Sequence, residues 1–244
     1  MTTIIPHDPE TNFRDDLVTF IGEREGDVRR IYTDGKGIPT MGIGFALFHQ
    51  TTGDQYTWRG GSAEALKTEL RDEIGVVLTD ENMAVLTETL TRLNDGDLPG
   101  VFELIPPSEP GERNGSYVNS EKNAFGFTLE DPDVTALLDL TLTEARTVLR
   151  TRLGTALYEK YDSSREMIAL TSLAFNNPVL IGSGLTGALQ GEDRAEAWFE
   201  IRYHSNADGE NANRRYYESD LFGLYNESPG KDDYLAVYRM YTRH

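Results

Sequence analysis

The stretch that decides the fold is EGDVRRIYTDGKGIPTMGIG, residues 25–44. A helical pattern ends at Glu25, and a short β-strand is predicted over residues 30–33. The glycines of residues 34–37 predict a turn. A second strand is predicted over residues 40–47, so this stretch should join the end of a helix to a β-hairpin.

The composition narrows the class of protein. The chain has 244 residues, enough for one large or two small domains, and 23 basic against 41 acidic side chains give a net charge of −18. This charge argues against a nucleic-acid-binding protein and against attraction to an anionic membrane surface. The chain contains no cysteine, which excludes disulfides and cysteine-ligated metals.

The remainder of the chain is predicted to be mainly helical, so the whole should have an α+β fold. One long segment, residues 97–133, contains five prolines and four glycines. It is predicted to be a loop or flap, with a short strand at residues 117–118 or 125–129. Helices are predicted over residues 12–25, 63–78, 79–93, 141–158, 163–175, 183–189, 192–203, 213–224 and 232–241, with Thr141 or Thr143 capping the fourth and Ser163 or Ser164 the fifth.

Two carboxylates and a hydroxyl are the candidate catalytic groups. Glu25 at a helix end, Asp34 in a turn and Thr40 on a strand each have an ordinary structural explanation. Together they place two acids at opposite ends of one strand, where they can face each other across a cleft. Such a pair performs glycoside hydrolysis when one acid donates a proton and the other activates water.

The spacing of these residues also resembles a known family. Glu25, Asp34 and Thr40, in the pattern Glu-x8-Asp-x5-Thr followed by Gly-x-Gly, resemble the N-terminal motif of the phage-type lysozymes, glycoside hydrolase family 24. Residues 170–176 are similar to the buried helix of that family that ends in Phe-Asn. Residues 213–222 are similar to its Arg-Arg-x-x-Glu motif.

The resemblance implies a lysozyme-like fold, with a small N-terminal β-hairpin lobe and a mainly helical C-terminal lobe. Residues 1–244 would form a single catalytic domain. Two departures stand out: Phe45 occupies a position where the family has histidine, and about 90 residues follow it before the helical lobe begins. This segment, residues 46–138, would be an insertion subdomain or a lid.

The resemblance also implies the activity: hydrolysis of the β-1,4 bond between N-acetylmuramic acid and N-acetylglucosamine, without a cofactor. Glu25 would be the general acid. Asp34 would position or deprotonate the attacking water, and Thr40 would hold that water from the other side.

Two residues of the helical part would bind the substrate. Arg214 matches an arginine that approaches the catalytic glutamate in the family, and its alternative is an ion pair with Glu218 or Glu210. Asn176 would bind an N-acetyl sugar, although capping of a helix explains it nearly as well.

No metal site is expected, because the four histidines are scattered along the sequence. The turns at residues 94–97 and 206–210 resemble calcium loops but lack the full EF-hand pattern, so solvated turns are the favoured interpretation.

The expected partner is bacterial peptidoglycan, bound by a monomer, with an immunity protein or a delivery carrier as a further possibility. Residues 1–20 lack the features of a signal peptide. A holin or a secretion system would therefore deliver the protein from the cytoplasm to the cell wall, as a phage endolysin or as a secreted antibacterial effector. The alternative is a non-catalytic, lysozyme-like wall-binding or structural module of a phage tail or secretion machine.

Overall fold

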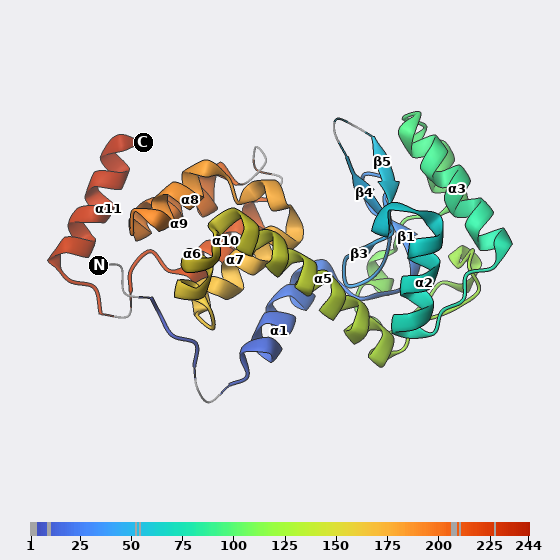
Figure 1. Cartoon of the computed structure of the whole chain (residues 1–244), viewed down its shortest axis with the longest axis horizontal. Coiled ribbons are helices and arrows are strands. Elements are labelled where there is room, and N and C mark those ends of the chain that lie inside the picture. Colours follow the sequence, from blue (N-terminus) through green and yellow to red (C-terminus); the bar gives the residue numbers. More distant parts are fainter. Residues whose placement is uncertain are drawn as a thin grey trace. The chain divides into compact units, whose positions relative to one another are not determined.

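The chain folds into two compact units (Figure 1). The hairpin unit is Glu25–Thr141, and the helical unit combines Met1–Arg24 with Leu142–His244. Helices dominate and the strands are short and antiparallel, so the predicted α+β class is confirmed. The computed structural model describes residues 4–8, 11–51, 53, 55–205, 209, 211–226 and 228–244.

The hairpin unit contains the predicted hairpin as part of a three-stranded sheet. Strands β1 (Val28–Thr33), β2 (Pro39–Gly42) and β3 (Phe45–Ala46) lie in the order β1-β2-β3. Tyr32 is paired with Thr40 across β1 and β2. The register therefore places these two residues directly opposite each other.

The second predicted strand, residues 40–47, does not run unbroken. Gly42 and Gly44 have positive φ angles of 56° and 72°, which turn the chain between β2 and β3. The chain then forms a second, two-stranded sheet from β4 (Phe48–Gln50) and β5 (Tyr56–Trp58).

Helices follow the two sheets. The prediction for residues 79–93 is confirmed, because Thr79 and Asn82 form a reciprocal capping box at the start of α3, with both hydrogen bonds at 3.1 Å. The predicted helix over residues 63–78 ends earlier than expected, since Gly75 takes a left-handed conformation with φ 66°. The helices of this part are η1 (Arg59–Gly61), α2 (Ala63–Ile74), α3 (Asp80–Asn94) and α4 (Leu98–Leu104), and α3 packs against β5.

One hydrophobic core joins the hairpin to the segment that follows it. Ile31, Met41 and Phe45 of the sheet belong to the same buried cluster as side chains from α2, α3 and α4. Phe45 is fully buried, and the guanidinium of Arg59 lies over its ring with Cζ 3.9 Å from the centroid. The aromatic ring at this position therefore packs against a cation of the segment that the resemblance treats as inserted.

The predicted flap, residues 97–133, is anchored to β1 over much of its length. The buried guanidinium of Arg30 donates two 2.8 Å hydrogen bonds to the buried carboxylate of Glu112. Arg30 also donates to the carbonyls of Pro106 and Pro107. The expectation of a strand at residues 117–118 or 125–129 was wrong, since the segment forms α4 and the short helices η2 (Pro110–Glu112) and η3 (Ser120–Lys122).

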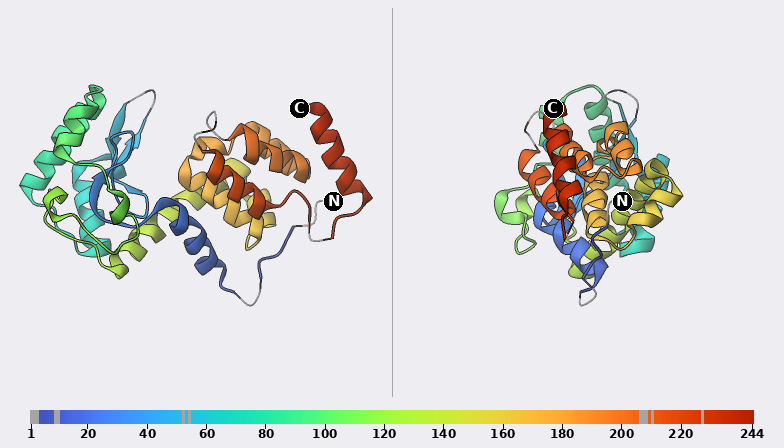
Figure 2. Two further views of the ribbon diagram at one scale, coloured as in Figure 1. Left: turned by 180° about the vertical axis from the view of Figure 1, so that it is seen from behind. Right: turned by 90° about the vertical axis from the view of Figure 1, so that its left-hand side faces the viewer.

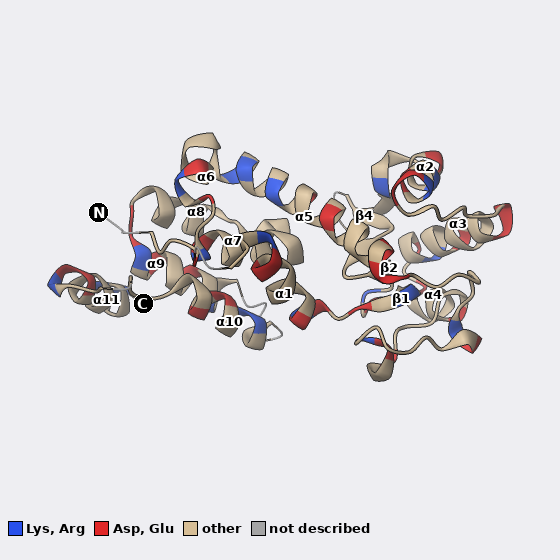
Figure 3. Ribbon diagram, turned by 90° about the horizontal axis from the view of Figure 1, so that it is seen from below, with Lys and Arg blue, Asp and Glu red and all other residues tan. Residues whose placement is uncertain are grey.

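The start of the next helix also differs from its prediction. Helix α5 spans Asp131–Leu153, and Thr141 lies inside it, where its hydroxyl donates to the Leu137 carbonyl. The true start signal is the segment around Pro132, since proline is favoured in a first helical turn and Asp133 accepts the backbone amide of residue 130. Figure 3 shows basic residues of α5 in blue beside α6, where they form ion pairs with acidic residues.

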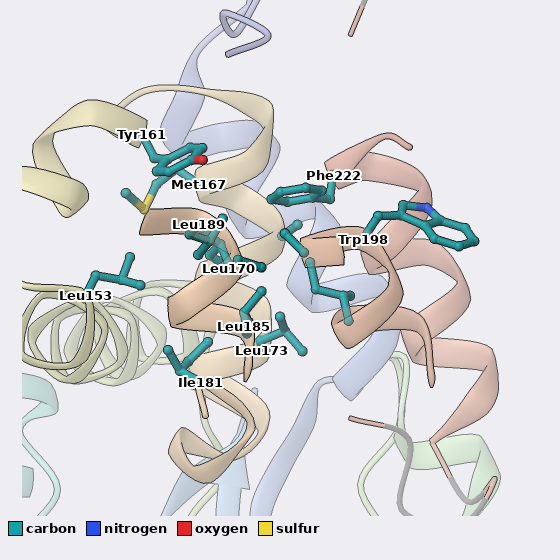
Figure 4. Packing of buried hydrophobic residues seen from close by; sticks show 14 of the residues in the cluster. Leu153, Tyr161, Met167, Leu170, Leu173, Ile181, Leu185, Leu189, Trp198 and Phe222 are labelled. Carbon is teal, nitrogen blue, oxygen red and sulfur yellow. The ribbon is translucent and has the colours of Figure 1, made fainter. Parts of the chain in front are cut away.

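The helical unit is built around α7, in which nine residues are buried, and Ser164 caps it by accepting the amide of Met167 at 3.1 Å. Both ends of the chain belong to this unit (Figure 2). Figure 4 shows side chains from α7, α8 and α10 gathered in its core. Its elements are α1 (Phe13–Glu25, the last residue belonging to the hairpin unit), α6 (Thr155–Tyr161), α7 (Arg165–Asn176), η4 (Pro178–Leu180), α8 (Ser183–Gln190), α9 (Arg194–Phe199), the π-helical turn η5 (Glu200–His204), α10 (Ala212–Phe222) and α11 (Lys231–Arg243).

Candidate functional site

Glu25 is the last residue of α1 and is half-buried. The chain turns sharply after it, because Gly26 has a φ of 81°, and a Cβ there would lie 2.9 Å from the carbonyl oxygen of Arg113. Arg113 donates to the carbonyl of Glu25 at 3.1 Å and accepts the amide of Asp27 at 2.8 Å. The turn that positions Glu25 therefore requires glycine at residue 26 and is held by hydrogen bonds to Arg113.

Asp34 lies in the hairpin turn and is also half-buried. Its Oδ1 accepts the backbone amides of Lys36 at 2.9 Å and Ile38 at 2.8 Å, which fixes the turn. Burial raises the pKa of this carboxyl above its ordinary value, and the backbone hydrogen bonds only partly oppose that effect. Both of these hydrogen bonds are accepted by Oδ1, and the amide of Gly37 also lowers the pKa of this carboxyl.

Tyr32 lies on β1, between the two carboxylates in the sequence. Its side chain is 7% exposed, and burial raises the pKa of its phenol to about 12. After burial, the charges of Glu25 and Asp34 contribute to this rise, while those of Arg113 and Arg30 oppose it. Electrostatic effects weaken with distance, so both carboxylates are close enough to this phenol for their charges to change its pKa. The hydroxyl stays protonated near neutral pH and makes no hydrogen bond to the part of the chain that the structure describes.

Thr40 is the cross-strand neighbour of Tyr32. Directly opposed residues of an antiparallel pair project from the same face of the sheet. The Thr40 side chain is 6% exposed, and its hydroxyl donates to the Ile38 carbonyl at 3.1 Å. Its oxygen is therefore left as an acceptor. Of the three predicted catalytic residues, Thr40 is thus paired with Tyr32 across the strands, and the charges of Glu25 and Asp34 act on the pKa of Tyr32.

Tyr32 lies within the stretch 25–44, but the sequence alone predicted no role for it. A signal was present: Tyr32 and Asp34 are two positions apart, which is the spacing of residues on one face of a strand. The signal was incomplete because the burial of this phenol, which raises its pKa, arises only in the folded chain.

Arg214 belongs to the helical unit, on α10. Its Nε donates to Glu218 at 3.1 Å, and its Nη2 lies 3.2 Å from both the carbonyl and the hydroxyl of Ser172. The ion pair with Glu218, proposed as the alternative from the sequence, is therefore formed, and it is mostly buried rather than superficial. The other proposed partner, Glu210, lies outside the described residues.

Asn176, the last residue of α7, belongs to the same polar network. Its Oδ1 accepts a 2.5 Å hydrogen bond from Arg215, which also forms an ion pair with Glu218. Capping of the following turn is performed by the next residue, Asn177, whose side chain accepts the amide of Val179. The amide nitrogen of Asn176 remains the group that would contact an N-acetyl sugar.

A pocket of about 410 Å³ opens in the helical unit beside this network. Arg214 is one of its walls. The other lining residues are Glu23, Arg24, Asn213 and Tyr217.

Among the described residues no group of three or more His, Asp or Glu side chains could hold a metal ion. The turn at residues 94–97 is used structurally: Asn94 accepts the amide of Tyr56 at 2.7 Å, and Asp97 caps α4 through the amide of Gly100 at 3.1 Å. The turn at residues 206–210 lies, apart from Gly209, outside the described part of the chain.

No helix within the described ranges is both long and apolar enough to cross a membrane. No family model, no curated protein and no solved structure matches this chain. Its function is therefore inferred from its own residues.

Proposed function

We propose that this protein is a muramidase that hydrolyses the β-1,4 bond between N-acetylmuramic acid and N-acetylglucosamine in peptidoglycan. The observation that supports it best is that Tyr32 is buried directly opposite Thr40, and that burial and the charges of Glu25 and Asp34 raise the pKa of its phenol. Two carboxylates beside one neutral donor have the composition that general acid/base glycoside hydrolysis needs.

In this proposal Glu25, in its acid form, gives its proton to the glycosidic oxygen as the bond to the anomeric carbon breaks. Asp34, ionised, takes a proton from the water that attacks this carbon. A raised pKa makes Asp34 a stronger base wherever it is still ionised. Carboxyl groups ~6.5–9.5 Å apart would give inversion of configuration, and ~5–5.5 Å would give retention.

Neutral groups complete the proposed site. Thr40, whose own hydrogen is donated to a carbonyl, would accept a hydrogen bond from the attacking water. Tyr32 would donate its hydrogen to a substrate oxygen or to that water. By the resemblance, the cation Arg214 and the amide nitrogen of Asn176, both in the helical unit, would also contact the sugar chain.

The test is the Glu25→Gln variant on purified peptidoglycan sacculi. Loss of the general acid should lower the rate of muropeptide release by about 10²–10⁴-fold. Glu64→Gln is the matched control, because that carboxylate is 83% exposed on α2 and should leave the rate unchanged. A folded Glu25→Gln protein that works at the parent rate would refute the assignment.

The parent protein separates the alternative function from the proposed one. Binding to sacculi without release of muropeptides would instead indicate the non-catalytic wall-binding module. Expression in the cytoplasm and in the periplasm then tests the setting. An enzyme that requires delivery by a holin or a secretion system should lyse cells only from the periplasmic side.

A further inference from the structure

The pocket of about 410 Å³ in the helical unit has an unusual charge for this chain. Its lining holds two arginines, Arg24 and Arg214, against one glutamate, Glu23. The chain as a whole carries a net charge of −18, with 41 acidic side chains. In so acidic a chain, a pocket lined by two guanidinium groups and one carboxylate departs from the average composition.

Arg24 is oriented by aromatic side chains. Its Cζ lies 3.6 Å from the centroid of the Phe20 ring and 4.9 Å from that of Tyr217. Its side chain is only 15% exposed, and Nη1 donates to the carbonyl of Phe20. Nε is buried and has no hydrogen-bond partner among the described residues. Stacking fixes the plane of the guanidinium while leaving donor capacity unused.

Glu23 does not neutralise this arginine effectively. Its carboxylate is 3.4 Å from Nη1 of Arg24, which is long for a charged hydrogen bond, and its side chain is 66% exposed. An exposed pair of this kind is screened by solvent and contributes little. A better-placed anion would compete with it.

Arg214 is held rigidly, since Glu218 and Ser172 receive hydrogen bonds from its Nε and Nη2. Asn213 and Tyr217 add neutral polar groups to the wall, and the Tyr217 side chain is 44% exposed. A planar, pre-oriented guanidinium matches a carboxylate in shape and in charge.

We infer that this pocket binds a carboxylate group carried by the substrate. The carrier follows from the proposed function, on which this inference rests: peptidoglycan has free carboxylates on its peptide stems, and a lactyl carboxylate on each muramic acid that has lost its stem. Arg24 directly precedes the proposed acid, Glu25, in the sequence. The shared ligand chemistry is the carboxylate, and the two sources can be separated by experiment.

The experiment uses the full chain with Glu25→Gln, so that no probe is hydrolysed, and measures binding by calorimetry. The probes are a muramic acid–glucosamine disaccharide with a free lactyl carboxylate, the same disaccharide with its peptide stem, and the neutral N,N′-diacetylchitobiose. A carboxylate-bearing probe should bind better than the neutral one. Adding Arg24→Gln should weaken that binding about ten- to a hundredfold, as expected for hydrogen bonds to a charged group, and leave the neutral probe unaffected.

The matched control is Arg150→Gln, which removes an arginine 51% exposed on α5 and should change no affinity. If Arg24→Gln does not fold, Tyr217→Ala tests the same pocket by removing a ring against which the guanidinium lies, with a severalfold loss expected. Preference for the stem-bearing disaccharide assigns the stem carboxylate, and equal binding of both charged probes assigns a site for either. Binding of all three probes alike, or insensitivity to the pocket variants, overturns the inference.

The outcome is independent of catalysis. If the parent protein releases no muropeptides but the charged probes bind through Arg24, the pocket stands and the muramidase proposal fails. If the parent releases muropeptides and the Arg24→Gln protein binds every probe as before, the muramidase proposal stands and the pocket inference fails.

Discussion

Two clusters of buried charge, one in each unit, are built differently. In the hairpin unit the fully buried cation Arg30 is matched by one carboxylate, Glu112, through two 2.8 Å hydrogen bonds. The amides of Glu109 and Asn119 complete the environment of that carboxylate at 2.9 Å each. This pair is a closed structural unit that ties β1 to the segment after α4.

In the helical unit Glu166 and Glu218 are both fully buried, and Glu218 is shared by two arginines, Arg214 and Arg215. Ser172 donates to the same carboxylate at 2.6 Å. A one-to-one pair satisfies a buried charge and leaves little for a ligand, whereas a carboxylate shared by two arginines anchors one of them in the wall of a pocket. The difference suggests a scaffold role for the first cluster and a binding role for the second.

The largest expected effect on activity is that of Asp34→Asn, in the hairpin unit. Removing the proposed base should lower muropeptide release by about 10²–10⁴-fold. Asparagine keeps the oxygen that accepts the amides of Lys36 and Ile38. Asp95→Asn, at an exposed position after α3, is the control and should retain the parent rate.

The same variant has a predicted effect on stability. Burial raises the pKa of Asp34 above its ordinary 3.8, so its contribution to stability is fully present below pH 3.8 and is lost as the pH rises through the folded-state pKa. At pH 7 the variant should therefore melt at or above the parent temperature, and this advantage should vanish near pH 3. A lower melting temperature at pH 7 would contradict this account of Asp34.

The two buried clusters can be broken separately. Glu112→Gln and Glu218→Gln should each lower the free energy of unfolding by about 3–5 kcal/mol, because each leaves a buried cation unmatched. Only Glu218→Gln should also weaken carboxylate binding, since Arg214 loses its anchor. Urea unfolding and calorimetry measure the two effects, and equal loss of binding in both variants would remove the distinction between the clusters.

The lowered pKa of Glu112 predicts how the stability of the protein depends on pH. Burial alone would raise its pKa, but the hydrogen bonds from Arg30 and from two backbone amides outweigh burial and lower it to about 2, from an ordinary 4.5. Its contribution is therefore present above pH 4.5 and is lost as the pH falls toward 2. The difference in stability between the parent and Glu112→Gln should shrink over this range.

A smaller effect is expected for Tyr32→Phe. Loss of a donor to a charged or reacting oxygen should lower kcat about ten- to a hundredfold, while the buried ring and the stability are retained. Tyr161→Phe is the matched control and should leave kcat unchanged. Burial raises the pKa of Tyr161 to about 12 as well, but this residue lies in the core of the helical unit. A kcat unchanged in Tyr32→Phe would show that the phenol is only a packing residue.

The smallest effect is expected for Thr40→Val. Valine keeps the shape and β-propensity of threonine, so only one neutral hydrogen bond is lost, roughly a three- to tenfold decrease in rate. Thr33→Val removes a buried hydroxyl that donates to Ile105 at 2.8 Å and should lower stability without lowering the rate of the folded enzyme. A reversed pattern would place the water-holding hydroxyl at Thr33.

Local signals predicted much of the fold. The capping box of Thr79 and the cap of Ser164 depend on atoms three residues away, so the sequence contains both partners of each hydrogen bond. The start of α5 was missed although its signal, Pro132, is local, because threonines at 141 and 143 offered a competing cap. The break after Gly42 was missed because its bulky apolar neighbours favour a continuous strand.

The candidate site likewise has features that local sequence predicts and features that only the fold shows. The spacing of Glu25, Asp34 and Thr40, the turn glycines between them and the absence of cysteine can all be read from the chain, since they depend on residue type and short separations. The pairing of Arg30 with Glu112 spans 82 positions, and the contact of Arg215 with Asn176 spans 39. No local preference selects such partners, because a buried charge is matched by whichever opposite group the packed core brings to it. Only the folded chain therefore shows that Tyr32 is buried, that the charges of two acids act on it, and that Arg24 lies in the wall of a pocket.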